Sequence, residues 1–149
     1  MNDTIDVRPD ERFDESMLAA YLRGKLPGSD LPLTVRQFGG GAANLTYLLA
    51  YGDADTDAYY EYVLRRPPLG PVAKSAHDMN REHRVLSVLH QSLPVAPQAF
   101  LYCEDTAIVG ADFFVMERRH GTVVRTEIPD NYAGMPDATR RMSQALIDT

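Results

Sequence analysis

Three consecutive glycines, Gly39 to Gly41, are the residues of this sequence that most directly indicate binding of an anion. They lie between two segments of strand-like composition and are therefore expected to form the turn of a hairpin. Backbone N–H groups in a glycine turn can approach an anion closely and donate hydrogen bonds to it. A Rossmann or Walker A motif does not fit, because no helix follows and Gly-Lys-Ser/Thr is absent. A purely structural β-turn remains the alternative explanation.

A carboxylate in an apolar stripe is the second feature that indicates a functional site. The spacing predicts a helix over residues 76–90, and at about 100° per residue Glu82 falls within its apolar face. The apolar side chains of that face are Met79, Val85, Leu86 and Leu89. Burying a carboxylate is costly unless it is paired, so we expect a cationic partner for Glu82. The alternative is a glutamate at the helix margin that reaches water.

Two adjacent arginines, Arg65 and Arg66, are the candidate partners of Glu82. They end a predicted strand over residues 59–66, and successive residues of a strand point to opposite faces. Only one of them can therefore meet Glu82, and the alternation alone does not decide which. Both arginines could also be solvated residues at the end of the strand.

The elements that must position these residues predict an α+β fold. A first helix begins after Asp14 and ends before Gly24, and the Ser75–Asp78 capping-box pattern opens the helix over residues 76–90. The predicted strands cover residues 33–38, 45–51, 59–66, 99–103 and 113–117, with a turn around Glu104 and Asp105. Residues 1–12 have no periodicity and are expected to be a disordered tail. From Pro136 the pattern becomes helical again.

Size and charge limit the possible function classes. A chain of 149 residues has room for one domain. The net charge of -6 argues against general binding to nucleic acids or anionic membranes, which depends on cationic side chains. No apolar run approaches the roughly 18–20 residues needed to cross a bilayer. Cys103 is the one cysteine, so no disulfide framework is expected and the cytoplasm is the expected compartment. The histidines and the Asp53–Asp57 segment lack the spacing of metal ligands, so no metal site is expected.

The glycine loop, the basic strand and the acidic helix follow one another in a characteristic order. This order resembles the N-terminal lobe of the protein-kinase-like fold, in particular the aminoglycoside-phosphotransferase-type family, over about Leu33 to Gly121. Residues 40–47 match the family's Gly-Gly-x-Ser-Asn-x-Thr-Tyr-like loop, except that Ala43 replaces the serine. Residues 63–68 and 81–86 resemble the branch found fused to, or beside, acyl-CoA dehydrogenases.

The resemblance implies a five-stranded antiparallel sheet with one packed helix, and it implies a role in ATP binding for particular residues. Arg65 occupies the position of the kinase lysine that binds the α/β-phosphates and pairs with the helix glutamate, here Glu82. The glycine-loop positions are Gly39, Gly40, Gly41, Ala42, Ala43, Asn44 and Thr46, and Asn44 replaces the third glycine of the kinase pattern. The adenine positions are Val63, Met116 and backbone groups near Glu117 and Arg119, although residues 113–117 could also be a plain core strand.

The same resemblance predicts how the chain is divided and what it does. Residues 13–121 would be the nucleotide-binding lobe, and residues 122–149 a linker and the truncated start of a helical C-terminal lobe. The catalytic His-x-Asp-x-x-x-x-Asn loop and the metal-binding aspartate are absent before Thr149, so this chain alone is expected to be inactive. The parent protein would use ATP and Mg²⁺ to phosphorylate a hydroxyl group of a metabolite, and the resemblance to the acyl-CoA dehydrogenase-associated branch implies a hydroxyacyl-CoA. A non-catalytic scaffolding module is the alternative, left open by Ala43 and Arg65, and the sequence does not distinguish ATP from GTP.

The chain on its own is expected to self-associate, because the sheet surface and the C-terminal apolar stripe would lack their covering lobe. Sedimentation velocity over a concentration series tests this, and the expected result is a sedimentation coefficient that rises with concentration. A sample that stays monomeric at high concentration would contradict the expectation.

Overall fold

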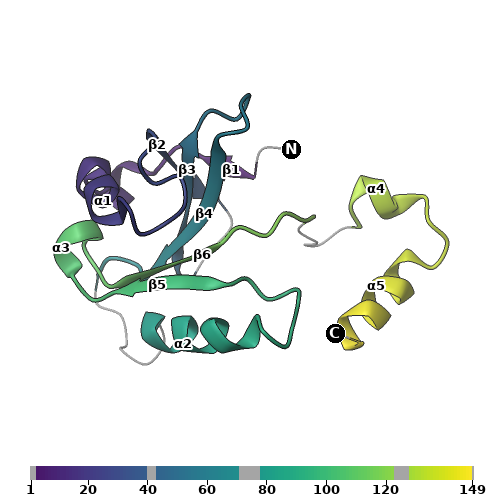
Figure 1. Ribbon diagram of the computed structural model, residues 1–149. Helices are drawn as coiled ribbons and strands as arrows, with labels where there is room; N and C mark the ends of the chain where they lie inside the picture. Colours follow the sequence, from purple (N-terminus) through teal and green to yellow (C-terminus); the bar gives the residue numbers. More distant parts are fainter. Residues whose placement is uncertain (1–2, 40–42, 71–77, 123–127, 149) are drawn as a thin grey trace. The chain divides into compact units, whose positions relative to one another are not determined.

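A six-stranded antiparallel sheet organises the described part of the N-terminal unit (Figure 1). The computed structural model describes residues 3–39, 43–70, 78–122 and 128–148, which belong to two units, residues 1–118 and 119–149. The strands are β1 (Thr4–Ile5), β2 (Leu33–Phe38), β3 (Leu45–Gly52), β4 (Tyr59–Arg66), β5 (Ala99–Cys103) and β6 (Phe113–Glu117). Their order across the sheet is β1-β2-β3-β4-β6-β5.

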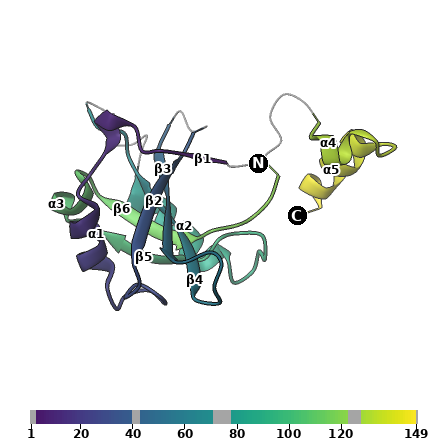
Figure 2. The same ribbon diagram turned by 90° about the horizontal axis from the view of Figure 1, so that it is seen from above.

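Helices cover both faces of this sheet. The helices α1 (Glu15–Leu22) and α3 (Thr106–Val109) lie side by side on one face, where Leu18 and Leu22 pack into the main core (Figure 1, Figure 2). The helix α2 (Met79–Leu89) packs on β5 and β6 from the other face. Phe113 and Phe114 are both fully buried, because neighbouring residues of β6 point to opposite, covered faces.

The five strands predicted from the sequence are confirmed, four with the same bounds and β3 extended by one residue to Gly52. The fold is α+β, as predicted. Asp14 caps α1 as predicted, since its side chain accepts hydrogen bonds from the backbone N–H groups of Ser16 and Met17 at 2.9 and 3.1 Å. Strand-like composition and the turn residues between the segments were therefore sufficient to locate the strands.

The prediction of a disordered tail is wrong for residues 3–12, and the predicted five-stranded sheet has a sixth strand. Thr4 and Ile5 pair with Phe38 and Gln37 at the edge of the sheet. A short 3₁₀ helix, η1 (Pro9–Glu11), follows. The reason for the error is physical, because a two-residue strand held by backbone hydrogen bonds has no side-chain periodicity to detect.

Two further segments differ from the predictions. The turn expected around Glu104 and Asp105 continues into the one-turn helix α3, which Asp105 caps. The helix α2 begins at Met79 with Asp78 as its N-cap, whereas the predicted cap Ser75 lies outside the described residues. Its buried face is also rotated from the predicted stripe, so that Val85 and Val88 are exposed.

Arg66 is fully buried, on the face of the sheet that α1 and α3 cover. Its guanidinium donates hydrogen bonds to the Tyr47 hydroxyl at 2.7 and 3.1 Å and to the backbone carbonyls of Glu11 and Val109. The rings of Phe13 and Tyr47 lie 5.3 and 5.2 Å from the guanidinium carbon, within cation–π range. Arg66 therefore connects β4 to η1 and to the end of α3.

The Tyr47 hydroxyl contributes to the same network. Burial raises the pKa of Tyr47, and the neighbouring Arg66 opposes that rise without cancelling it. The hydroxyl thus stays protonated at neutral pH and donates to the Glu11 carbonyl at 2.9 Å. This hydrogen bond gives the N-terminal segment, expected to be loose, a second attachment to the sheet.

The second unit contains α4 (Asp130–Ala133) and α5 (Ala138–Ile147) among its described residues. Asp137 precedes α5 with φ of 59°, and its carboxylate pairs with Arg140 at 3.0 Å. Across the described residues, none of the helices combines the length and the apolar character that crossing a membrane requires.

The adjacent arginines give a matched pair of stability predictions. Arg66→Ala is expected to lower the free energy of unfolding by about 3–5 kcal/mol, because it leaves a cavity and several buried acceptors without donors. Arg65→Ala should cost under about 1 kcal/mol, since Arg65 lies partly in solvent. Urea denaturation of both variants measures the difference. Equal losses would contradict the assignment of the two side chains to opposite faces.

Candidate functional site

Two rows of side chains cross the face of the sheet on which α2 packs. Strand register places Thr46, Arg65 and Phe114 opposite one another in the row nearer the glycine loop. The next row contains Leu48, Val63 and Met116. Directly paired residues of antiparallel strands share a face, so residues from three strands form one surface here.

An ion pair connects the first row to α2. Arg65 Nη1 lies 2.9 Å from Glu82 Oε2, and the two side chains are 29% and 27% exposed. The prediction that Glu82 turns inward and meets a cation is therefore confirmed. The structure also decides between the two arginines, because Arg66 points to the opposite face. At this exposure the pair adds little to stability, and a ligand can reach it.

Asn44 contacts the second oxygen of Glu82. The side-chain amide of Asn44 donates to Glu82 Oε1 at 3.0 Å, and Asn44 itself is only 8% exposed. Both carboxylate oxygens of Glu82 therefore have partners, one from β4 and one from the glycine loop. The resemblance placed Asn44 among the residues facing a ligand, whereas in the structure its amide faces α2.

Arg65 retains hydrogen-bonding capacity. Its Nε is buried and has no hydrogen-bond partner among the described residues. A buried donor without a partner costs about 1–3 kcal/mol, a cost that an anion at this position would remove. The guanidinium is thus held by Glu82 and remains able to bind one more acceptor.

The other predicted site residues are only partly brought together. Gly39 and Ala43 lie at the two described ends of the loop, and Gly40, Gly41 and Ala42 lie outside the described residues. Val63 is buried and Met116 half-buried in the second row. Arg119 belongs to the second unit and is not placed relative to this face.

The side chain and the backbone N–H of Glu117 both bond to the backbone of Gln98. Its carboxylate accepts a hydrogen bond from the Gln98 backbone N–H at 3.1 Å, and its own N–H donates to the Gln98 carbonyl at 2.8 Å. Its position in β6 also directs the side chain to the face opposite Met116. Only backbone atoms of Glu117 are therefore suited to a role beside Val63 and Met116.

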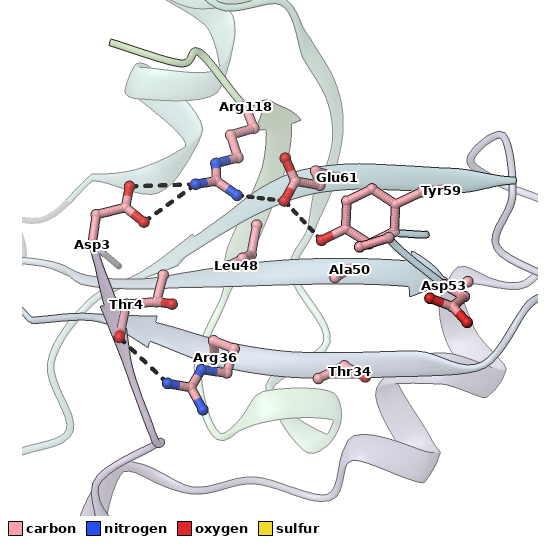
Figure 3. A pocket seen from close by; sticks show the side chains of 12 residues that line it. Asp3, Thr4, Thr34, Arg36, Leu48, Ala50, Asp53, Tyr59, Glu61 and Arg118 are labelled. Carbon is pink, nitrogen blue, oxygen red and sulfur yellow. Dashed lines mark hydrogen bonds and ion pairs between the residues drawn. The ribbon is translucent and has the colours of Figure 1, made fainter. Parts of the chain in front are cut away.

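Sequence reasoning missed a cavity of about 540 Å³ at the other end of the same face. Arg118 lies across it, pairing with Glu61 at 2.5 Å and with Asp3 at 3.2 Å (Figure 3). Leu48 lines the cavity and also belongs to the second row, so the two regions adjoin. The alternation in β3 places Leu48 on the same face as Thr46. This alternation was the signal in the sequence that could have identified Leu48 as a residue of this face.

The charged groups around this cavity pair with one another. Glu61 accepts hydrogen bonds from both Arg118 and the Tyr59 hydroxyl, the latter at 2.9 Å. Arg36 pairs with Asp6 at 2.5 Å. Burial raises the pKa of Tyr59, and its hydrogen bond to Glu61 adds to the effect, so the phenol stays neutral. Both arginines of the cavity are thus engaged by carboxylates, whereas Arg65 Nε has no partner among the described residues.

His83 packs the helix that carries Glu82 onto the sheet. Its ring stacks on Tyr102 at a centroid distance of 5.9 Å and lies 6.3 Å from the ring of Phe114. Burial lowers the pKa of His83 from its ordinary value of 6.5. The neutral form of His83 therefore favours the packing that positions Glu82. Among the described residues no group of His, Cys, Asp or Glu side chains could hold a metal ion.

Known proteins are similar to this chain in sequence and in fold. The sequence matches the phosphotransferase enzyme family over residues 34–149. It is similar to acyl-CoA dehydrogenase family member 11 from Mus musculus (37% identity) and Homo sapiens (34%), each alignment covering 83% of this chain and 16% of the relative. It is also similar to a solved structure assigned to the aminoglycoside phosphotransferases, from Ralstonia eutropha JMP134. That likeness has a TM-score of 0.62 and 29% identity, covering 87% of this chain and 34% of the other.

The lowered pKa of His83 predicts a pH dependence of stability. The unfolded chain takes up a proton at His83 more readily than the folded chain, so stability falls as the pH drops through about 6.5. His83→Gln is expected to reduce the loss of unfolding free energy between about pH 7 and pH 5. His120→Gln, at an exposed histidine, is the control. It should lose as much unfolding free energy over this pH range as the wild type does. Denaturation curves across this range test the prediction, and identical pH profiles for the wild type and His83→Gln would contradict it.

Proposed function

Because the chain belongs to the phosphotransferase enzyme family, we propose that its first unit is the nucleotide-binding lobe of an ATP-dependent phosphotransferase. The parent protein would transfer the γ-phosphate of ATP to a hydroxyl group of a small metabolite. The observation that carries the proposal is the Arg65 guanidinium, which Glu82 holds at 2.9 Å and whose buried Nε lacks a partner among the described residues.

Arg65 would bind the α- and β-phosphates of the nucleotide. A guanidinium presents donors in a fixed planar fork, so one nitrogen can hold a carboxylate while another binds a phosphate oxygen. Glu82 would orient this fork and limit its movement. The backbone N–H groups of the glycine loop would cover the phosphates from the other side.

The adenine base would pack beside the second row of side chains. Val63 would form the floor of this site, and Met116, which is half-buried, would contact the base. Backbone groups near Glu117 would hydrogen-bond its edge. This assignment rests on the register of β4 and β6, which places Val63 directly opposite Met116.

The remaining parts of the reaction are assigned outside this chain. Phosphoryl transfer requires Mg²⁺ and an aspartate that positions the attacking hydroxyl. The described residues do not gather carboxylates that could hold a metal ion. This chain spans 16% of the first two relatives named above and 34% of the solved structure, so both requirements are proposed to be met by other parts of the parent protein.

A hydroxyacyl-CoA is our proposed acceptor, and the cytoplasm the proposed compartment. The support for the acceptor is that the similar proteins are named as acyl-CoA dehydrogenase family members. A kinase domain in such a protein would act on the hydroxyl of an acyl chain carried by coenzyme A. Comparing phosphoryl transfer to hydroxyacyl-CoA and to the free hydroxy acid would test this choice.

Calorimetric titration of the complete protein with MgATP tests the proposed function. The wild type should bind, and Arg65→Ala should weaken binding by about tenfold or more, as expected for a lost charge-assisted hydrogen bond. Arg36→Ala is the matched control, because Arg36 pairs with Asp6 at the other end of the face. Absence of binding by the wild type, or equal affinity of Arg65→Ala, would overturn the proposal. Binding of MgATP without phosphoryl transfer would instead favour the non-catalytic module.

A further inference from the structure

We propose that Asn44 is a positioning residue that keeps Arg65 available to phosphate by occupying one oxygen of Glu82. The inference rests on the proposed function of the site and adds a role for the loop that the sequence pattern did not indicate. It derives from two contacts of the Glu82 carboxylate, from Asn44 Nδ2 to Oε1 and from Arg65 Nη1 to Oε2.

Asn44 occupies a fixed place between two elements. It directly precedes β3, whose first residue, Leu45, pairs with Arg66 of β4. The Asn44 side chain is nearly buried and is short, so few rotamers are open to its amide. Its hydrogen bond to Glu82 therefore joins the glycine loop to α2.

The hydrogen bond limits how Arg65 and Glu82 can pair. An arginine and a carboxylate commonly form two parallel hydrogen bonds, which would use both oxygens of Glu82 and two nitrogens of Arg65. Here Asn44 holds Oε1 at 3.0 Å, and Arg65 contacts Oε2 through Nη1. The pairing stays single, and Nε of Arg65 remains without a partner among the described residues.

Removing the Asn44 amide would release this constraint. In Asn44→Ala, Glu82 Oε1 loses the donor that fixes the orientation of the carboxylate, so the carboxylate can turn and present both oxygens to Arg65. The guanidinium would then close onto Glu82 through Nη1 and Nη2, and phosphate would have to compete with a carboxylate for Nη2. Affinity for the triphosphate should fall, because the Arg65 guanidinium is drawn toward Glu82. This loss would occur although Asn44 does not itself contact the nucleotide.

A double-mutant cycle in the complete protein tests this role. Asn44→Ala should weaken MgATP binding by about tenfold, a coupling typical of residues in one hydrogen-bond network. In the Glu82→Ala background the same change should have almost no further effect, because Asn44 acts through Glu82. Asn44→Asp keeps the side-chain size but removes the donors, and it should weaken binding at least as much. Asn80→Ala, at an exposed asparagine of α2, is the matched control and should bind as the wild type does.

Two outcomes would overturn the inference. One is wild-type affinity in Asn44→Ala. The other is an equal loss from Asn44→Ala with and without Glu82, which would mean that Asn44 contacts the nucleotide directly. A wild type that binds no MgATP would instead overturn the proposed function. In that case a crystal structure of Asn44→Ala still decides the geometry, since two hydrogen bonds between Arg65 and Glu82 are expected and an unchanged single contact would refute them.

Discussion

The alternation of side chains at the end of β4 is the constraint on which the rest of the structure depends. Arg65 and Arg66 are adjacent in sequence, and a strand sends adjacent side chains to opposite faces. Arg66 therefore enters the core below α1 and α3, where carbonyl oxygens and aromatic rings surround it. Arg65 reaches the other face and meets Glu82. The end of β4 thus holds the N-terminal segment in place through Arg66. Through Arg65 it presents a cation on the face where α2 packs.

Side-chain periodicity explains how much of the fold the sequence could predict. The strands β2 to β6 alternate or carry long apolar runs because one or both of their faces are buried, and their bounds followed from that pattern. The strand β1 and the helix α3 depend on backbone pairing, one capping side chain and the buried Arg66 network. Apart from the local Asp105 cap, these contacts join residues far apart in the chain and leave no local pattern to read.

The site shows the same division between local and long-range information. A carboxylate within an apolar stripe was enough to predict that Glu82 faces a cation, although the buried face of α2 is rotated from the predicted one. Choosing Arg65 over Arg66 required knowing which face α2 covers, and a single strand does not contain that information. The contact between Asn44 and Glu82 spans 38 residues of sequence, so only the folded structure could reveal it.

The central claim is that the cation held by Glu82 binds the phosphates of a nucleotide. The most direct test is a crystal structure of the complete protein with Mg²⁺ and a non-hydrolysable ATP analogue. Our account predicts an α- or β-phosphate oxygen within about 2.7–3.2 Å of Arg65 Nε, with the contact between Arg65 and Glu82 retained. An analogue bound on the face below α1 and α3, or one whose phosphates do not contact Arg65, would contradict the account.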